Sequence, residues 1–198
     1  LLVEPQERLE IARQIAEEEG YSMIHPFDQA DVIAGQGTIG LEILDQFPEV
    51  KNVFVPMGGG GLISGIASAI KALQPEVKVI GLETAAVPKF SQNMKNVIPV
   101  AVSEKPSIAD ALLSNKPGKL PLELVKKHVD QIISVEEEPL RDGFRLLIEE
   151  GRIIAEPSSA IGIGAVLQGT LNDLNLANSV FVISGGNISP QDIWSILK

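Results

Sequence analysis

The 198-residue sequence contains no cysteine. Disulfides, thiolate metal sites and a cysteine nucleophile are therefore excluded, and we expect a cytoplasmic protein. Basic side chains are also scarce, because 16 Lys and Arg stand against 26 Asp and Glu, which gives a net charge of −10. A chain of this charge repels phosphate backbones at long range. Nucleic acid is therefore not expected as a partner.

Long apolar runs are missing as well. No stretch approaches the roughly 18 uninterrupted apolar residues that cross a bilayer, and the N-terminus lacks a basic region followed by an apolar core, so no membrane partner is expected. The only two histidines, His25 and His128, lie far apart in the sequence, which disfavours a shared zinc site. We interpret both as structural or solvent-exposed.

Short apolar runs alternate with helical patterns along the chain. The runs predict strands at residues 50–57, 78–83, 97–102, 131–136 and 179–186. Helices are predicted at residues 5–20, around 39–47, and at 62–73, 88–95, 121–129, 138–152, 157–169 and 190–197. This order indicates an α/β fold with a parallel sheet buried on both faces. We expect residues 25–35 to form a loop and the Pro- and Lys-rich segment 103–120 to be a long surface excursion.

Four consecutive glycines, Gly58–Gly61, follow one predicted strand and precede a helical pattern. Glycine lets backbone N–H groups approach a ligand closely, and a helix N-terminus adds a partial positive charge, so the loop predicts a phosphate site. The alternative is a tight turn with close packing, for which one or two glycines suffice. The loop continues with Leu62, Ile63 and Ser64 instead of Lys followed by Ser or Thr, which disfavours a nucleoside triphosphate.

A second glycine segment, GQGTIG at residues 35–40, fits the pattern G-x-G-x-x-G. A dinucleotide site needs a strand directly before the glycines and an acidic residue about 20 residues later, at the end of the next strand. Residues 31–34 are too few for a convincing strand, and the next strand ends in Val55, Pro56 and Met57 without a carboxylate. We interpret GQGTIG as a look-alike and keep a nicotinamide enzyme as a weaker alternative.

The segment VISGGN, residues 182–187, ends another predicted strand. Ligands in parallel α/β sheets bind outside the carboxyl ends of the strands, so we expect Ser184 and the glycine loop to face one crevice. A phosphate site and a hydroxyl some distance away fit a small phosphorylated cofactor. Glu156 precedes Pro157 and a small-residue helix. We expect its carboxylate to cap backbone N–H groups, with a role facing the cofactor as the second choice.

Six segments, taken in order, resemble the threonine dehydratase and serine racemase family of pyridoxal-phosphate enzymes, of the tryptophan-synthase-like fold: HPFDQADVIAGQGTIGLEIL, VFVPMGGGGLISGIA, SIADAL, VDQIISVEEE, IIAEPSSA and VISGGN. The resemblance covers nearly the whole chain. It implies β-elimination of a hydroxy amino acid such as threonine or serine to a 2-oxo acid and ammonia, with pyridoxal 5'-phosphate as cofactor. It also implies a small-molecule amino acid substrate and a homo-oligomer, a dimer, in the full-length protein.

The resemblance also implies roles for individual residues. The backbone N–H groups of Gly58, Gly59, Gly60, Gly61 and Leu62 would bind the 5'-phosphate. The Ser184 hydroxyl would bond the pyridine nitrogen and, being neutral, would leave that nitrogen largely unprotonated, which suits elimination over transamination.

The sequence departs from the family in what it lacks. The family's Schiff-base lysine lies upstream in a Ser-x-Lys-x-Arg setting, and no lysine here lies in such a setting. We therefore assign no catalytic residue and expect the chain alone to be inactive. The chain begins with Leu1, not Met. Residues 1–25 match the end of the family's small domain and residues 26–198 its large cofactor-binding domain without the N-terminal part, so we expect a C-terminal portion of such an enzyme.

Two further departures affect the site. Some relatives bind a divalent cation through a Glu and an Asp six residues later, but here Glu83 is followed by Lys89, so no metal site is expected. The family usually reads Ala-Asp-Gly where this chain has Ala109, Asp110 and Ala111, which puts in doubt any backbone contact that needs glycine there. A serine racemase fragment and a non-catalytic module that binds a phosphate or the cofactor remain as alternatives.

Overall fold

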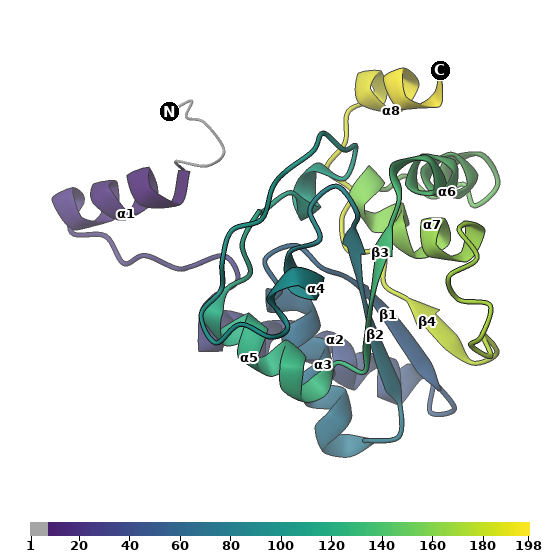
Figure 1. Ribbon diagram of the computed structural model, residues 1–198, viewed down its shortest axis with the longest axis horizontal. Coiled ribbons are helices and arrows are strands. Elements are labelled where there is room, and N and C mark those ends of the chain that lie inside the picture. Colours follow the sequence, from purple (N-terminus) through teal and green to yellow (C-terminus); the bar gives the residue numbers. More distant parts are fainter. Residues whose placement is uncertain (1–7) are drawn as a thin grey trace.

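The computed structural model describes residues 8–198, and its centre is a four-stranded sheet (Figure 1). The strands are β1 (Asn52–Pro56), β2 (Lys78–Thr84), β3 (Gln131–Val135) and β4 (Ser179–Phe181). Their order is β3-β2-β1-β4, and every neighbouring pair is parallel. The predicted α/β fold with a parallel sheet is therefore confirmed. The first residues of the helix predicted at 5–20 lie outside the described part.

Helices cover both faces of the sheet (Figure 1). They are α1 (Arg8–Glu19), α2 (Ala30–Gln46), α3 (Gly61–Leu73), α4 (Lys89–Asn93), α5 (Lys119–His128), α6 (Glu137–Glu149), α7 (Ile161–Leu167) and α8 (Pro190–Leu197), with short 3-10 helices η1 (Asp110–Leu112) and η2 (Pro157–Ala160). Helices α2, α3 and α5 pack on one face, and α6 and α7 on the other. None of the helices within residues 8–198 combines the length and the apolar character needed to cross a bilayer.

The central strand β1 is apolar throughout because both of its faces are buried. Val53 and Val55 belong to the core on the α3 side, whereas Phe54 belongs to the core on the α7 side. Successive side chains of a strand point to opposite faces, so a strand covered on both sides reads as a continuous apolar run. Phe54 also stacks on Phe181 of β4, with ring centroids 4.4 Å apart. This stacking ties the two strands that lead into the glycine loop and VISGGN.

Helices α2 and α3 pack at close range because glycines lie where they meet. A Cβ added at Gly65 would lie 2.6 Å from the backbone nitrogen of Gly37, and one added at Gly40 would lie 2.9 Å from the carbonyl oxygen of Ile66. Any side chain at these positions would push the helices apart. Gly37 and Gly40 of α2 therefore serve the packing of this helix on α3.

The segment GQGTIG lies inside α2 and not in a strand-to-helix turn. Its interpretation as a dinucleotide look-alike is confirmed, since a dinucleotide fingerprint requires that turn. The loop predicted at 25–35 is wrong in its second half, because α2 begins at Ala30. Three glycines lower the intrinsic helix propensity of this segment, and the packing of α2 on α3 outweighs that preference.

The strand predicted at residues 97–102 does not form. Val97, Ile98 and Val100 are 87%, 70% and 56% exposed, and β2 has strands on both sides. The backbone of Val100 instead pairs with the side chain of Asn93, which accepts its N–H at 2.7 Å and donates to its carbonyl at 2.9 Å. The surface excursion therefore begins directly after α4, earlier than the predicted residue 103.

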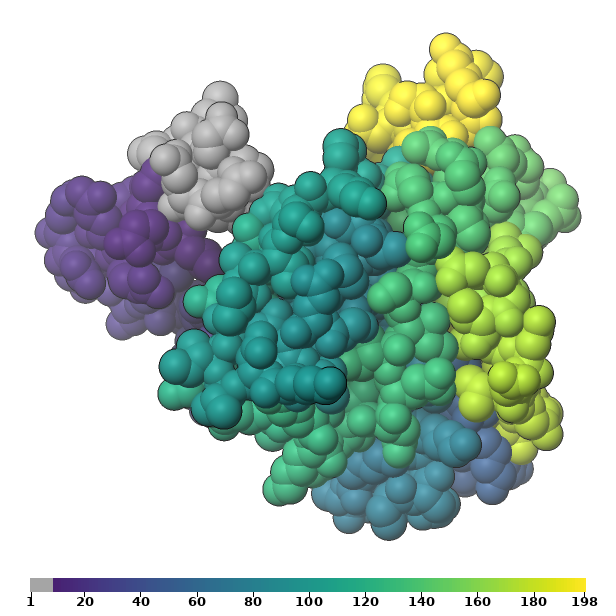
Figure 2. All heavy atoms as spheres, in the orientation of Figure 1, coloured from purple at the N-terminus to yellow at the C-terminus, as the bar shows by residue number. Residues whose placement is uncertain are grey.

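Helix α1 stands apart from the sheet and protrudes from the body of the molecule (Figures 1 and 2). The segment that joins it to α2 exposes Tyr21 and Ile24 to 66% and 69%. The domain boundary expected at residue 25 falls within this segment and stays a prediction. At the other end of the chain, β4 is shorter than the predicted strand 179–186 and stops at Phe181.

Candidate functional site

The glycine loop and Ser184 leave the same edge of the sheet. Strands β1 and β4 are parallel neighbours, with Phe54 paired to Phe181, and the N–H of Val182 continues the ladder by donating to the carbonyl of Phe54 at 3.0 Å. The glycine loop starts two residues after β1 ends, and Ser184 lies three residues after β4. Both segments therefore lie at the carboxyl edge of the sheet, where α/β proteins bind ligands.

The glycine loop presents a run of free backbone donors. Helix α3 begins at Gly61, and Ser64 is the first of its residues whose N–H makes a backbone bond, to the carbonyl of Gly60 at 3.0 Å. Within residues 8–198, the N–H groups of Gly58–Leu62 have no protein acceptor. Gly58, Gly59 and Leu62 are only half-buried. These donors lie at the positive end of a 13-residue helix. Free N–H groups at a helix N-terminus are a common type of phosphate-binding site.

Close packing explains why this loop has no side chains. Gly60 has a φ of +99°, a conformation that side chains disfavour. A Cβ added at any of the four glycines would collide with a neighbour: Cδ2 of Phe27 at 2.5 Å for Gly59, Cζ of Phe90 at 2.5 Å for Gly60, the carbonyl oxygen of Ala111 at 2.9 Å for Gly58, and Cα of Phe27 at 2.9 Å for Gly61. The packing alternative thus holds for all four glycines. It does not account for the free N–H groups.

Ser184 is exposed, and no hydrogen bond from its hydroxyl is found within the described chain. The residue after it is held firmly. The N–H of Gly185 donates to the Ser159 hydroxyl at 2.8 Å, and the same hydroxyl donates to the Gly185 carbonyl at 3.0 Å. The N–H of Glu156 also donates to that carbonyl at 3.1 Å. Ser184 is therefore a free hydroxyl on a fixed backbone.

The short helices η1 and η2 connect the two ends of the site. The N–H of Ala111 in η1 donates to the hydroxyl of Ser158 in η2 at 3.1 Å, and the next residue, Ser159, holds Gly185. The sequence did not predict a role for either serine. In AEPSSA they stand out only as small residues, and their hydrogen bonds are to residues distant in the sequence. Ala111 is not among the residues with a positive φ, so the backbone conformation at this position does not itself require glycine.

Glu156 occupies the N-cap position of η2 but makes no side-chain capping bond, so the capping prediction is wrong. Its carboxyl group instead lies against Gly185, where an added Cβ would be 2.6 Å from its Cδ. A small hollow of about 200 Å³ adjoins this region, lined by Ile108, Asp110, Pro157, Asn187, Ile188, Asp192, Ser195 and Ile196.

Glu83 and Lys89 are both fully buried beside the site. Glu83 accepts the N–H groups of Phe90 at 2.8 Å and Ser91 at 3.1 Å, which fixes the start of α4. The Lys89 ammonium donates to the carbonyl of Leu112 in η1 at 2.8 Å. Burial lowers the pKa of Lys89 to about 8, with Glu83 opposing the shift. No group of three or more potential metal ligands is found within residues 8–198, and the expected absence of a metal stays a prediction.

Of the two roles predicted for His25, structural or solvent-exposed, the structure supports the structural one. Its Nδ1 accepts the N–H of Asp28 at 2.9 Å and of Phe27 at 3.3 Å. Burial lowers the pKa of His25, with Asp28 opposing and Arg13 adding to the shift, so the neutral acceptor form is favoured. His128 is the last residue of α5, and burial together with nearby lysines lowers its pKa too.

Comparison with known proteins decides the family. The family model described as "Pyridoxal-phosphate dependent enzyme" matches residues 2–185. The chain belongs to this family. Its members use pyridoxal phosphate, and the resemblance seen in the sequence is confirmed.

Two curated relatives of the family illustrate the similarity. The L-threonine ammonia-lyase of Thermotoga maritima is 46% identical over 192 residues, which cover 97% of this chain and 47% of the relative. The catabolic L-threonine dehydratase TdcB of Escherichia coli strain K12 is 39% identical over 92% of this chain and 56% of its own length. The chain thus spans about half the length of the curated relatives it matches.

Solved structures of the family confirm the fold. Maize serine racemase superposes with a TM-score of 0.88 at 30% identity and covers 98% of this chain and 60% of its own. The threonine deaminase of tomato, Solanum lycopersicum, in its processed isoform 2, gives a TM-score of 0.86 at 30% identity over 93% of this chain and 54% of its own. The residues present also fit the phosphate of the family's cofactor, because the N–H groups of Gly58–Leu62 are donors without an acceptor in the part of the chain that the structure describes.

Proposed function

We propose that this chain is the cofactor-binding portion of a pyridoxal-phosphate-dependent threonine or serine dehydratase, which converts a hydroxy amino acid to a 2-oxo acid and ammonia. The observation that carries the proposal is the run of free N–H groups at Gly58–Leu62, at the same sheet edge as the Ser184 hydroxyl. The names of the relatives, L-threonine ammonia-lyase and L-threonine dehydratase, support the reaction class.

The chain's own residues bind and orient the cofactor in this proposal. The N–H groups of Gly58, Gly59, Gly60, Gly61 and Leu62 hold the 5'-phosphate, and the α3 dipole favours its negative charge without a basic side chain. The neutral Ser184 hydroxyl bonds the ring nitrogen and leaves it largely unprotonated. When bound, the cofactor supplies an electron sink for the substrate's α-carbon.

We further propose that residues 1–25 belong to the end of a small domain and residues 26–198 to the large cofactor-binding domain. The separation of α1 from the sheet supports this division. The full-length protein is proposed to be a cytoplasmic homo-oligomer, a dimer, which light scattering and cell fractionation of that protein test.

Racemisation of serine is the second candidate function, favoured by the similarity to maize serine racemase over 98% of this chain. The two activities give different products from L-serine. Chromatographic detection of D-serine, against detection of a 2-oxo acid, separates them in the full-length protein. If the full-length protein is a non-catalytic module, it should bind the cofactor and form neither D-serine nor a 2-oxo acid.

Cofactor binding is tested on the 198-residue chain by calorimetric titration with pyridoxine 5'-phosphate, which carries the ring and the phosphate but no aldehyde that reacts with surface lysines. Saturable binding at one site is expected, and NADH should not compete. With pyridoxal phosphate and L-threonine or L-serine, we expect no 2-oxo acid above the rate of free cofactor, because no lysine lies in the family's Schiff-base setting. Faster turnover would contradict the proposed inactivity of this portion.

A further inference from the structure

Two adjacent serines of η2, Ser158 and Ser159, are only 1% and 3% exposed. Ser158 bonds to Ala111, which lies against the glycine loop, and Ser159 bonds to Gly185, which follows Ser184. We propose that they are positioning residues: Ser158 fixes the phosphate end and Ser159 fixes the ring end, so that η2 sets the spacing between them. The inference rests on the proposed cofactor site and assigns a role to residues that do not touch the cofactor.

Ser158 is connected to the glycine loop through Ala111 of η1. Its hydroxyl accepts the N–H of Ala111 at 3.1 Å and donates to Oδ1 of Asp110 at 3.5 Å. The same N–H of Ala111 also donates to Oδ1 of Asp110 at 2.8 Å. The carbonyl of Ala111 lies against Gly58, where an added Cβ would be only 2.9 Å away. Ala111 is thus held by Ser158 and Asp110 on one side and lies against the first glycine of the loop on the other.

Ser159 is connected to Ser184 through hydrogen bonds to Gly185. The Ser159 hydroxyl accepts the N–H of Gly185 at 2.8 Å and donates to its carbonyl at 3.0 Å. One side chain therefore holds both polar groups of the residue that follows Ser184. Rotation of the Ser184–Gly185 peptide would break the N–H bond, and rotation of the Gly185–Gly186 peptide would break the carbonyl bond. Both bonds are part-buried, and polar groups left unpaired there are costly.

Helix η2, which contains both serines, is itself held in place. Pro157 occupies the first turn of η2, where its restricted φ is already suited to a helix. The N–H of Ser159 donates to the carbonyl of Glu156 at 3.0 Å, and η2 continues directly into α7, which packs on the sheet. Because the two hydroxyls are on consecutive residues of a rigid turn, the distance between their targets has little freedom.

The test uses the 198-residue chain and two probes, inorganic phosphate and pyridoxine 5'-phosphate, with affinities measured by calorimetry. Ser158→Ala should weaken both probes by a similar factor, about fivefold, since both contain the phosphate and one hydrogen bond is worth roughly this factor. Ser159→Ala should weaken pyridoxine 5'-phosphate by about fivefold and leave inorganic phosphate within about twofold. Ser68→Ala is the matched control, because the Ser68 hydroxyl is buried on α3 without a partner in the described structure, and neither affinity should change.

A merely structural role for the two serines would lower the melting temperature without separating the probes. If the unaltered chain binds both probes but both alanine variants lose them equally, or neither variant loses affinity, the inference is overturned while the proposed function stands. If the unaltered chain binds neither probe, the proposed site falls and the inference with it. Should an alanine variant fail to fold, Ser158→Cys and Ser159→Cys fill the space of the hydroxyl with a slightly larger thiol that hydrogen-bonds much more weakly. They should separate the probes in the same way.

Discussion

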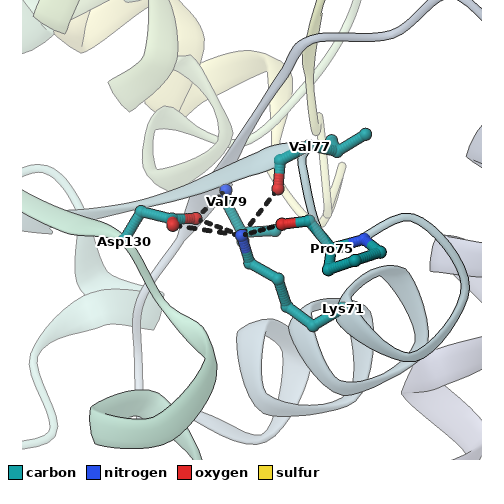
Figure 3. Close-up of polar contacts among 5 residues, drawn as sticks. All are labelled: Lys71, Pro75, Val77, Val79 and Asp130. Carbon is teal, nitrogen blue, oxygen red and sulfur yellow. Dashed lines mark hydrogen bonds and ion pairs between the residues drawn. The ribbon is translucent and has the colours of Figure 1, made fainter.

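The ammonium of Lys71 lies 2.8 Å from a carboxylate oxygen of Asp130, which joins the end of α3 to the start of β3 (Figure 3). The same ammonium donates to the carbonyls of Val77 at 2.8 Å and Pro75 at 3.1 Å, and Asp130 also accepts the N–H of Val79 at 2.7 Å. This cluster lies at the amino ends of the strands, opposite the glycine loop. It therefore stabilises the fold at the edge away from the candidate site.

Replacing Lys71 with Met should destabilise the chain without changing ligand affinity. The change removes the ion pair and leaves two carbonyls without their donor, which we expect to cost about 1–3 kcal/mol in the free energy of unfolding. Urea denaturation gives this value, and a cycle with Asp130→Ala isolates the coupling between the two side chains. A fall in phosphate affinity larger than about twofold would contradict the separation of the two edges.

A methyl group at Gly59 should disturb the glycine loop through Phe27. The Cβ of Gly59→Ala would lie 2.5 Å from Cδ2 of Phe27, so the ring must move, and overpacking of this kind costs about 1–3 kcal/mol. The displaced loop should also bind inorganic phosphate more weakly. Adding Phe27→Ala should restore part of the phosphate affinity, because it removes the clash.

Gly35→Ala is the matched control for the substitution at Gly59. Gly35 lies inside α2, it is exposed, and an added Cβ meets nothing within 4 Å. Ala in a helix interior is favoured over Gly by roughly 0.5–1 kcal/mol. The control should therefore stabilise the chain in thermal unfolding and leave phosphate affinity unchanged. Equal losses in both variants would show that the effect does not depend on Phe27.

Lys89 should make stability rise with pH. Burial lowers its pKa from 10.5 to about 8 in the folded chain, so between these values the unfolded chain binds more protons than the folded one. The destabilising effect of the buried charge is complete below about pH 8 and is relieved as pH rises towards 10.5.

Comparison with Lys89→Met isolates this group, because other titrating groups are common to both chains. From about pH 7.5 to about pH 10, the free energy of unfolding of the unaltered chain should rise by about 2 kcal/mol relative to the variant. Denaturant melts at several pH values give both curves. Parallel curves would show that the ammonium does not titrate in this window.

The sequence predicted the parts of the fold that local pattern determines. The runs around Phe54, Ile80 and Ile133 form buried strands as expected, because apolar residues covered on both faces have few alternatives. The run at 97–102 has the same local character but no open strand edge beside β1 or β2, and Asn93 satisfies its backbone. Sheet order is a long-range property that the composition of one segment does not contain.

For the candidate site too, the sequence predicted the local features but not the contacts between distant segments. Free donors after a strand follow from the consecutive glycines alone, and the edge shared with Ser184 follows from a parallel sheet. The contact of Phe27 with Gly59 and the bonds from Ser158 and Ser159 depend on how loops separated by many residues pack together. No spacing rule reports such contacts, which is why Glu156 was expected to cap a helix but lies against Gly185.

Ser184→Ala should change ligand affinity and little else. Ser184 is exposed, and its hydroxyl has no partner within the described residues, so its loss should alter the free energy of unfolding by less than about 0.5 kcal/mol. In the proposed site this hydroxyl bonds the ring nitrogen, a bond worth about 1 kcal/mol. Pyridoxine 5'-phosphate should therefore bind about fivefold more weakly, while inorganic phosphate binds as before. Ser103→Ala, an exposed serine in the surface segment after α4, is the control and should leave both affinities unchanged. Unaltered affinity of Ser184→Ala for pyridoxine 5'-phosphate would remove Ser184 from the ring end, and equal weakening of both ligands would assign it to the phosphate instead.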